Sequence, residues 1–188
     1  MLIKLIKYYN LKETSWSGGI TKEIYLYPDS ASYQNKNFLF RVSSAYISTI
    51  PSKFTLFIGY QRYFCMLDNN LELSINNKNI SLKAHDIINF QSEDDVISYQ
   101  TGNDFNIMLA EDIKDHHLKL TNGFNTSDHH FIIIFVLKDL QINIQGKDYQ
   151  LAQYDTIVIE NLEHESIDIV SKDHYLLGLI NLVHDSLF

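Results

Sequence analysis

The sequence predicts an all-β protein built from two jelly-roll β-barrel units that pack as one compact body. Short apolar runs separated by turn residues recur along all 188 residues, and regular helices between strands are not seen. Tyr and Phe, which favour strands, number 12 and 11. One stretch of alternating residues also occurs twice, which indicates an internal repeat.

The repeated stretch is Leu71–Phe90, which aligns without a gap with Leu140–Ile159. Each copy has an alternating run, a polar turn, a second alternating run, an Asp and a short apolar strand. Asp86 in the first copy aligns with Asp155 in the second. Any two β-hairpins share part of this pattern. The joint recurrence of turn, Asp and spacing favours a duplicated unit, with the first unit at about residues 1–110 and the second at about 125–188 of a single 1–188 domain.

The expected strands of the first half alternate apolar and polar residues between turn residues. The runs before the first copy of the repeat are Leu2–Ile6, Ile20–Tyr27, Phe38–Ile47, Phe54–Ile58 and Tyr63–Leu67. Pro28 and Pro51 mark turns, and Asn10–Gly19 is read as a polar connection. Gly59–Arg62 is read as the turn between two strands.

After the first copy, strands are expected at Val96–Gln100, Phe105–Leu109, Phe131–Leu137 and Tyr175–Leu182. The polar segment Glu111–His130 is ambiguous, with room for a short helix at Asp112–Leu120. It contains two adjacent histidine pairs.

The composition indicates which classes of partner the protein is expected to bind. The net charge is −8 with no basic cluster, so a nucleic-acid partner is not expected. The lone Cys65 cannot form an internal disulfide and is expected to be a buried apolar thiol. Lys4 and Lys7 interrupt the apolar run at the start of the chain, and no run is long enough for a bilayer. We therefore expect a cytoplasmic protein with no membrane partner, and an exposed edge strand would allow a homodimer.

Three expected strands carry a polar pair on one face and largely apolar residues on the other. The pairs are Thr21 with Glu23, Arg41 with Ser43, and Asp104 with Asn106. In one interpretation the polar faces lie outside, over an apolar core. In the other they turn inward and line a pocket in the mouth of a barrel.

Arginine is rare in this chain: of 15 basic residues, Arg41 and Arg62 are arginines and the rest are lysines. A guanidinium group binds a carboxylate in a planar, two-pronged geometry that an ammonium group lacks. Either arginine therefore suits a ligand carboxylate, and either suits a structural pair with Glu23 or Asp104. Trp16, the sole tryptophan, is expected to plug one end of a barrel or to cover a ligand.

No cofactor or metal is expected. The histidines in each adjacent pair would face opposite sides of a strand, and the others are scattered, so a transition-metal site is not supported. No phosphate-binding Gly-rich loop and no Gly-x-Ser-x-Gly motif is present. A Ser-His-Asp arrangement stays open at this level.

Four motifs resemble those of the HutD/Ves family. They are Trp16-Ser-Gly-Gly-Ile-Thr-Lys-Glu23, Phe40-Arg-Val-Ser-Ser-Ala45, Phe54-Thr-Leu-Phe-Ile-Gly-Tyr-Gln-Arg62 and Gly102-Asn-Asp-Phe-Asn-Ile-Met108. The resemblance implies a cupin-superfamily bicupin, with two RmlC-like jelly rolls and without the usual cupin metal ligands. One departure is Gln61, where the family often has an acidic residue before the arginine.

The resemblance also implies a bacterial protein with a regulatory role in histidine utilisation or the stress response, through a bound carboxylate such as formylglutamate or urocanate. The implied ligand-binding residues are Trp16, Thr21, Glu23, Arg41, Ser43, Arg62, Asp104 and Asn106, with Met108 packing in the wall. No catalytic residue is assigned. Two alternatives stay open: an enzyme that uses Glu23 or Asp104 as acid or base, and a protein-interaction module.

Overall fold

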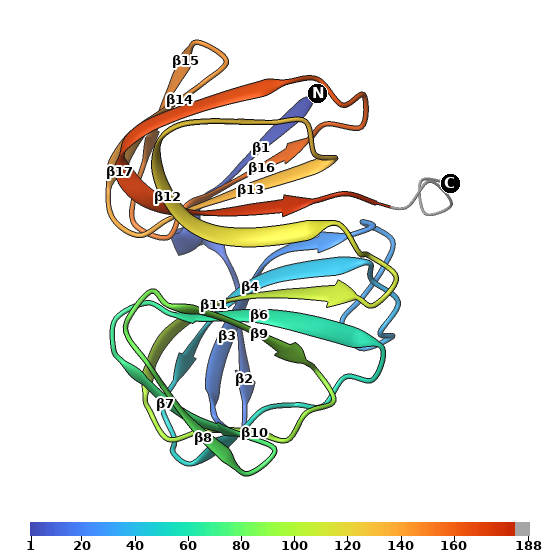
Figure 1. The fold of residues 1–188 in the computed structure, drawn as a ribbon, viewed down its shortest axis with the longest axis vertical. Coiled ribbons are helices and arrows are strands. Elements are labelled where there is room, and N and C mark those ends of the chain that lie inside the picture. Colours follow the sequence, from blue (N-terminus) through green and yellow to red (C-terminus); the bar gives the residue numbers. More distant parts are fainter. Residues whose placement is uncertain (183–188) are drawn as a thin grey trace. The chain divides into compact units, whose positions relative to one another are not determined.

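The computed structural model describes residues 1–182, and the chain divides into two compact units (Figure 1). The central unit is Leu11–Glu111, and the terminal unit joins Met1–Asn10 to the residues from Asp112 onward. The first ten residues thus belong with the C-terminal half, whereas the sequence interpretation placed them in the first unit. The reason is strand pairing, because β1 (Leu2–Ile6) runs antiparallel to β16 (Thr156–Glu160).

Two antiparallel sheets form the central unit. The larger has the order β2 (Glu13–Trp16), β3 (Gly19–Tyr27), β4 (Phe40–Ile47), β11 (Gly102–Ala110), β6 (Tyr60–Met66) and β9 (Ile87–Gln91). The smaller has the order β5 (Ser52–Lys53), β10 (Val96–Ser98), β7 (Leu71–Ile75) and β8 (Lys78–Leu82). Phe64 and Met66 of the larger sheet pack against Leu71 and Leu73 of the smaller, so one apolar core joins the two sheets.

The terminal unit is a single curled sheet of seven strands (Figure 1). Besides β1 and β16 it contains β12 (His116–Ser127), β13 (Phe131–Val136), β14 (Leu140–Ile144), β15 (Lys147–Leu151) and β17 (Ile167–Ile180), and the short 3-10 helix η1 is Tyr8–Asn10. Its interior is a cluster of buried Ile, Leu and Val side chains with Tyr175. The β-branched residues that favour strands therefore also fill this unit.

The repeat is present in the structure strand for strand. The β7–β8 hairpin and β9 correspond without a shift to the β14–β15 hairpin and β16, with the same pairing register. Both hairpin turns use two residues with positive φ, Asn76-Asn77 in one and Gln145-Gly146 in the other. The aspartate of each copy accepts a hydrogen bond from the backbone N–H three residues before it. Asp86 Oδ2 accepts the Lys83 N–H at 2.9 Å, and Asp155 Oδ2 accepts the Ala152 N–H at 3.0 Å.

Four local expectations are wrong. The run Phe54–Ile58, expected to be a strand, is irregular, and the segment 10–19, read as a connection, contains β2. The segment with room for a short helix at 112–120 instead leads into β12, which pairs along its length with β17. Long-range pairing therefore overrides the weak local preference of this polar segment. The fourth error concerns Arg62, which lies within β6 and not in a turn, because that strand begins at Tyr60. Its side chain consequently has a fixed direction on one face of the sheet.

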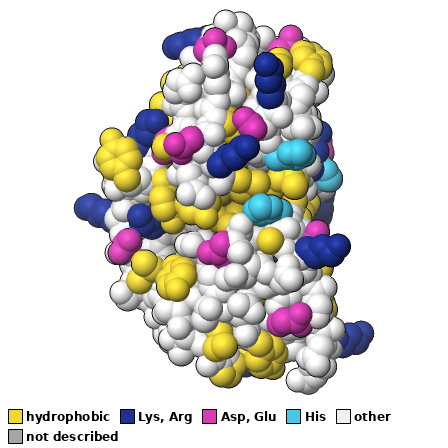
Figure 2. Space-filling view, turned by 90° about the vertical axis from the view of Figure 1, so that its left-hand side faces the viewer, with side chains coloured by type: hydrophobic (Ala, Val, Ile, Leu, Met, Phe, Trp, Pro, Cys, Tyr) yellow, Lys and Arg dark blue, Asp and Glu magenta, His cyan; other side chains and the backbone are white. Residues whose placement is uncertain are grey.

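Within residues 1–182, no helix has the length and apolar character needed to cross a bilayer. On the face shown in Figure 2, Lys and Arg side chains are interspersed with Asp and Glu and do not gather into one basic patch.

Candidate functional site

A cavity of about 520 Å³ lies in the central unit. Its walls include all eight residues that the sequence singled out: Trp16, Thr21, Glu23, Arg41, Ser43, Arg62, Asp104 and Asn106. The volume falls in the range of cavities that hold small molecules. Of the two interpretations of the polar strand faces, the structure therefore shows the inward one.

Antiparallel pairing arranges these side chains in three rows across one face of the larger sheet. From β3 or β4 toward β6, the rows are Thr21-Ala45-Asp104, Glu23-Ser43-Asn106 and Arg41-Met108-Arg62. A β-bulge follows Glu23 in β3, and beyond it the pairing with β4 resumes shifted by one residue, with Leu26 opposite Arg41. Because neighbouring strands lie about 4.8 Å apart, the backbones at Arg41 and Arg62 are about 10 Å apart, with buried Met108 between them.

Arg41 is held by several partners in the cavity wall. Its Nε donates to Glu23 Oε2 at 2.7 Å, and its Nη1 donates to Ser43 Oγ at 3.0 Å. The ring of Tyr33 lies over the guanidinium group, with 4.4 Å from Cζ to the ring centroid. One charge of opposite sign and one aromatic face thus fix its position.

Arg62 is buried as well, but it has fewer polar partners than Arg41. It is 6% exposed, and its Nη2 donates to the Thr55 carbonyl at 3.2 Å. Among the described residues, it forms no ion pair and its Nε has no hydrogen-bond partner. Burial lowers the pKa of Arg62 to about 10, against the opposing influence of Tyr33 and Asp104, so the group is cationic at neutral pH. The rings of Phe54 and Phe90 lie near the guanidinium group, with 5.8 and 5.9 Å from Cζ to the ring centroids. A buried guanidinium without a carboxylate partner is nevertheless costly for the folded chain.

Asp104 is 3% exposed, and its Oδ1 accepts the Ala45 N–H at 3.2 Å. Burial raises the pKa of Asp104 to about 7, although this N–H and the charges of Arg62 and Arg41 act in the opposite direction. Within residues 1–182 it forms no ion pair with either arginine. The cavity therefore contains a carboxyl group that keeps its proton to a much higher pH than an ordinary aspartate does.

Trp16 stands at the end of β2, where it packs against the core between the two sheets. Gly18 makes room for it, because a β-carbon on Gly18 would collide with the Trp16 ring. Trp16 Nε1 and Asn106 Oδ1 are both buried and have no hydrogen-bond partner in the described part of the chain. The sole tryptophan thus forms part of the cavity wall and of the neighbouring core.

The sequence interpretation missed Tyr33 and Thr55. Tyr33 comes from a loop read as polar, where it is the only aromatic residue between 31 and 37, and that isolation is the signal that was available. Thr55 acts through its backbone carbonyl, for which side-chain patterns carry no signal. Gln61 precedes Arg62 in β6, so its side chain faces the opposite side of the sheet. An acidic residue at position 61 would therefore not neutralise Arg62 from within the cavity.

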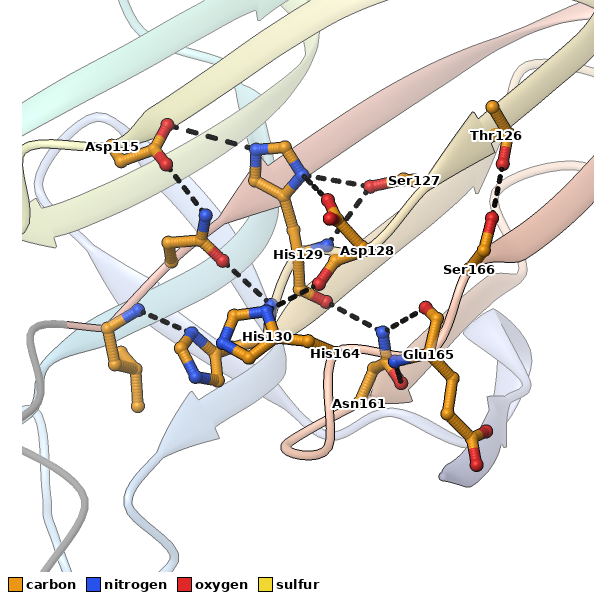
Figure 3. Close-up of polar contacts among 12 residues, drawn as sticks. Asp115, Thr126, Ser127, Asp128, His129, His130, Asn161, His164, Glu165 and Ser166 are labelled. Atoms are coloured by element: carbon orange, nitrogen blue, oxygen red, sulfur yellow. Dashed lines mark hydrogen bonds and ion pairs between the residues drawn. The ribbon is translucent and has the colours of Figure 1, made fainter.

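A second polar cluster lies in the terminal unit, around the turn between β12 and β13 (Figure 3). Ser127 Oγ is 2.9 Å from His129 Nδ1, and His129 Nε2 is 3.8 Å from Asp115 Oδ1. The chain of contacts from Ser127 through His129 to Asp115 resembles a nucleophilic triad. However, Ser127 Oγ also accepts the His129 N–H in a local turn. Asp115 is largely exposed and accepts a hydrogen bond from Asn181 at 2.6 Å. The cluster therefore ties this turn to the end of β17.

No three His, Cys, Asp or Glu side chains within the described part of the chain are arranged to hold a metal ion.

The motifs that line the cavity and the fold both indicate the same protein family. The family described as HutD matches residues 8–177 of the sequence. The chain belongs to the HutD family. The resemblance predicted from four short motifs is thus confirmed over most of the chain, including the second half, where motifs were lacking.

Solved structures show the same fold at low sequence identity. HutD from Pseudomonas fluorescens SBW25 is 19% identical, with a TM-score of 0.81 over 96% of this chain and 98% of its own. PA5104 of Pseudomonas aeruginosa PAO1, a conserved protein of unknown function, is 20% identical, with a TM-score of 0.82 over the same shares. A cupin 2 conserved barrel domain protein from Leptotrichia buccalis is 11% identical, with a TM-score of 0.60 over 95% of this chain and 96% of its own. No match was found among curated proteins. This HutD-family chain therefore has the all-β cupin fold expected from its sequence.

Proposed function

We propose that this protein binds a small carboxylate-bearing metabolite in the central-unit cavity, with Arg62 holding the carboxylate. The role is regulatory and cytoplasmic, in histidine utilisation or the stress response, and the ligand is of the formylglutamate or urocanate type. The observation that carries the proposal is the buried guanidinium of Arg62, which faces a cavity and forms no ion pair among the described residues.

The charges around the cavity support an anionic ligand. Arg41 is neutralised by Glu23, at 2.7 Å. Among the described residues Arg62 has no such partner, and burial raises the pKa of the remaining acid, Asp104, to about 7. The wall thus carries a net positive charge that a carboxylate would neutralise. In a site screened from water, a charged hydrogen bond to guanidinium is stronger than a neutral one.

The two arginines have different tasks in this proposal. Arg41 is already oriented by Glu23, Ser43 and the Tyr33 ring, so it shapes the wall and holds the Tyr33 loop. Arg62 has donor capacity left for the ligand, since its one hydrogen bond goes to Thr55. Trp16 and Met108 supply apolar surface for the rest of a small metabolite.

Thermal unfolding with N-formylglutamate, urocanate and histidine tests the proposal. We expect at least one carboxylate to raise the Tm at millimolar concentration, because a ligand that binds only the folded state stabilises it. Arg62→Met should abolish the shift while the protein stays folded, since Met keeps the length and apolar stem of the side chain. Lys53→Met is the matched control, because Lys53 is an exposed cation of the same unit, outside the cavity and paired with Asp95.

No shift with any of the three compounds, or an equal shift in Arg62→Met, would contradict the proposal. The same mixtures also test the enzyme alternative, for which the raised pKa of Asp104 is the specific support. The proposed binding role predicts that each compound is recovered unchanged. Conversion that stops in Asp104→Asn, with folding intact, would replace the binding role by catalysis.

A further inference from the structure

The two oxygen atoms of Asp104 have different surroundings. Oδ1 accepts the amide N–H of Ala45 on β4. Oδ2 has no hydrogen-bond partner among residues 1–182, yet it is not among the fully enclosed atoms without a partner. Asp104 lines the cavity, so Oδ2 is its accessible oxygen. Because an atom that accepts an N–H is a poor place for a proton, the neutral carboxyl group carries its proton on Oδ2.

The charged groups that act on Asp104 come from several elements. Arg62 of β6 and Arg41 of β4 favour its ionised form, whereas Asp68, in the turn after β6, opposes it. Glu23 of β3 faces the same cavity but is committed to Arg41. Buried Cys65, on β6, has its pKa raised to about 12 by burial and by Asp104 and Asp86, so it stays neutral. Desolvation outweighs the two arginines, which is why the acid keeps its proton up to neutral pH.

The charge balance of an occupied cavity decides the state of this acid. With Asp104 neutral, one ligand carboxylate balances Arg62, and Arg41 stays balanced by Glu23. With Asp104 ionised, the charges of the cavity wall already sum to zero, and the same ligand brings an unmatched negative charge into a buried site. Two carboxylates in one desolvated site repel each other unless one of them holds a proton.

We propose that Asp104 enters the complex as the neutral acid and donates a hydrogen bond from Oδ2 to the carboxylate that Arg62 holds. The inference rests on the proposed function and adds a specificity-determining residue to it. An O–H to carboxylate bond is short and strong, and it selects an anion over a neutral amide or ester of the same shape. Each anion is then bound together with one proton whenever the empty site starts in the ionised state.

Calorimetric titration with N-formylglutamate from pH 6 to pH 9 tests the inference, because the carboxyl groups of this probe are ionised throughout that range. Ionisation of Asp104, with a pKa of about 7, competes with binding. The Kd should therefore rise roughly tenfold at pH 8 and roughly 100-fold at pH 9, relative to pH 6. At pH 8, titrations in phosphate and in Tris, which differ in ionisation enthalpy, should report uptake of nearly one proton.

Asp104→Asn sharpens the test, because its amide accepts from Ala45 through Oδ1 and donates to the cavity without titrating. Its Kd should not change with pH, so at pH 9 it should bind N-formylglutamate more tightly than the unchanged protein. Glu163→Gln, which removes an exposed acid of the terminal unit, should keep the full pH dependence. Even if the Asn variant fails to fold, proton uptake by the unchanged protein shows whether the ligand is bound together with a proton.

The outcomes separate the two proposals. A Kd that is constant from pH 6 to pH 9, without proton uptake, overturns the inference and leaves carboxylate binding intact. A pH dependence that persists in Asp104→Asn assigns the proton to another group and also overturns the inference. Absence of binding at pH 6 for N-formylglutamate, urocanate and histidine alike overturns the proposed function itself.

Discussion

In the central unit, Arg62 of β6 pairs with Phe90 of β9 and Met108 of β11. At the corresponding place in the terminal unit, Ile132 of β13 pairs with Ile159 of β16 and Leu179 of β17. The correspondence continues along both strands. By the same register, Asn106 corresponds to Leu177 and Asp104 to Tyr175. Three polar positions of one unit are thus apolar or aromatic in the other.

The difference shows that this strand arrangement does not require arginine or aspartate at these places. In the terminal unit the equivalent side chains are fully buried and pack into one apolar cluster, which is the more stable way to fill such an interior. The central unit instead keeps a cavity of about 520 Å³ and a buried cation that has no carboxylate partner among residues 1–182. Both features cost stability, which fits a site kept for a ligand.

The largest effect should come from moving the cation to the filled unit. Ile132→Arg places a charge among apolar side chains, with no cavity and no ligand, and should destabilise the protein by about 4 kcal/mol or more. Urea unfolding followed by circular dichroism measures the loss. Ile132→Met is the control, since a swap of similar volume should cost less than about 1.5 kcal/mol. If the arginine variant were as stable as the control, the comparison between the units would lose its energetic basis.

A smaller effect concerns pH and Asp104. Its pKa rises from 3.8 to about 7 on folding, so the stabilising contribution of the neutral acid is complete at low pH and lost as pH rises through 7. Asp104→Asn does not titrate, and it should gain about 2–3 kcal/mol relative to the unchanged protein between pH 5 and pH 8. Urea unfolding of both proteins at the two pH values gives this difference. An equal stability gap at both values would contradict the neutral state of Asp104.

The smallest effect probes what the units share. Asn77 and Gly146 occupy the same place in the two hairpin turns, with φ of 66° and 78°. Asn77→Gly should stabilise the central unit, and Gly146→Asn should destabilise the terminal unit, each by less than about 1 kcal/mol. A β-carbon at Gly146 would meet no atom within 4 Å, so the change acts through the backbone alone. Thermal unfolding should show shifts of opposite sign, and shifts of the same sign would mean that the turns are not equivalent.

Much of this arrangement was predictable because successive side chains of a β-strand point to opposite faces, so that the residues of each face alternate in the sequence. The alternation of Thr21 with Glu23 and of Asp104 with Asn106 is visible in the sequence alone and indicates four cavity residues. The scarcity of arginine located two more. The alignment of Asp86 with Asp155 predicted a hairpin that recurs with the same register.

The rest depended on contacts between segments far apart in the chain. The residues of 116–127 carry no local pattern that predicts a strand. This segment is extended because β12 pairs with β17. The choice between an inward and an outward polar face depends on which sheet lies opposite, and so could not be read from one strand. The division of tasks between Arg41 and Arg62 follows from Tyr33 and Thr55, which reach the site from irregular segments.

The position of Trp16 has a practical consequence. It is the sole tryptophan of the chain and it lies in the wall of the central-unit cavity, while the terminal unit has none. Its fluorescence emission therefore reports on one half of the molecule without any label. During heating, Trp16 emission would report the unfolding of the central unit, and circular dichroism would report the unfolding of both units. A difference between the two transition temperatures would show that the units unfold separately.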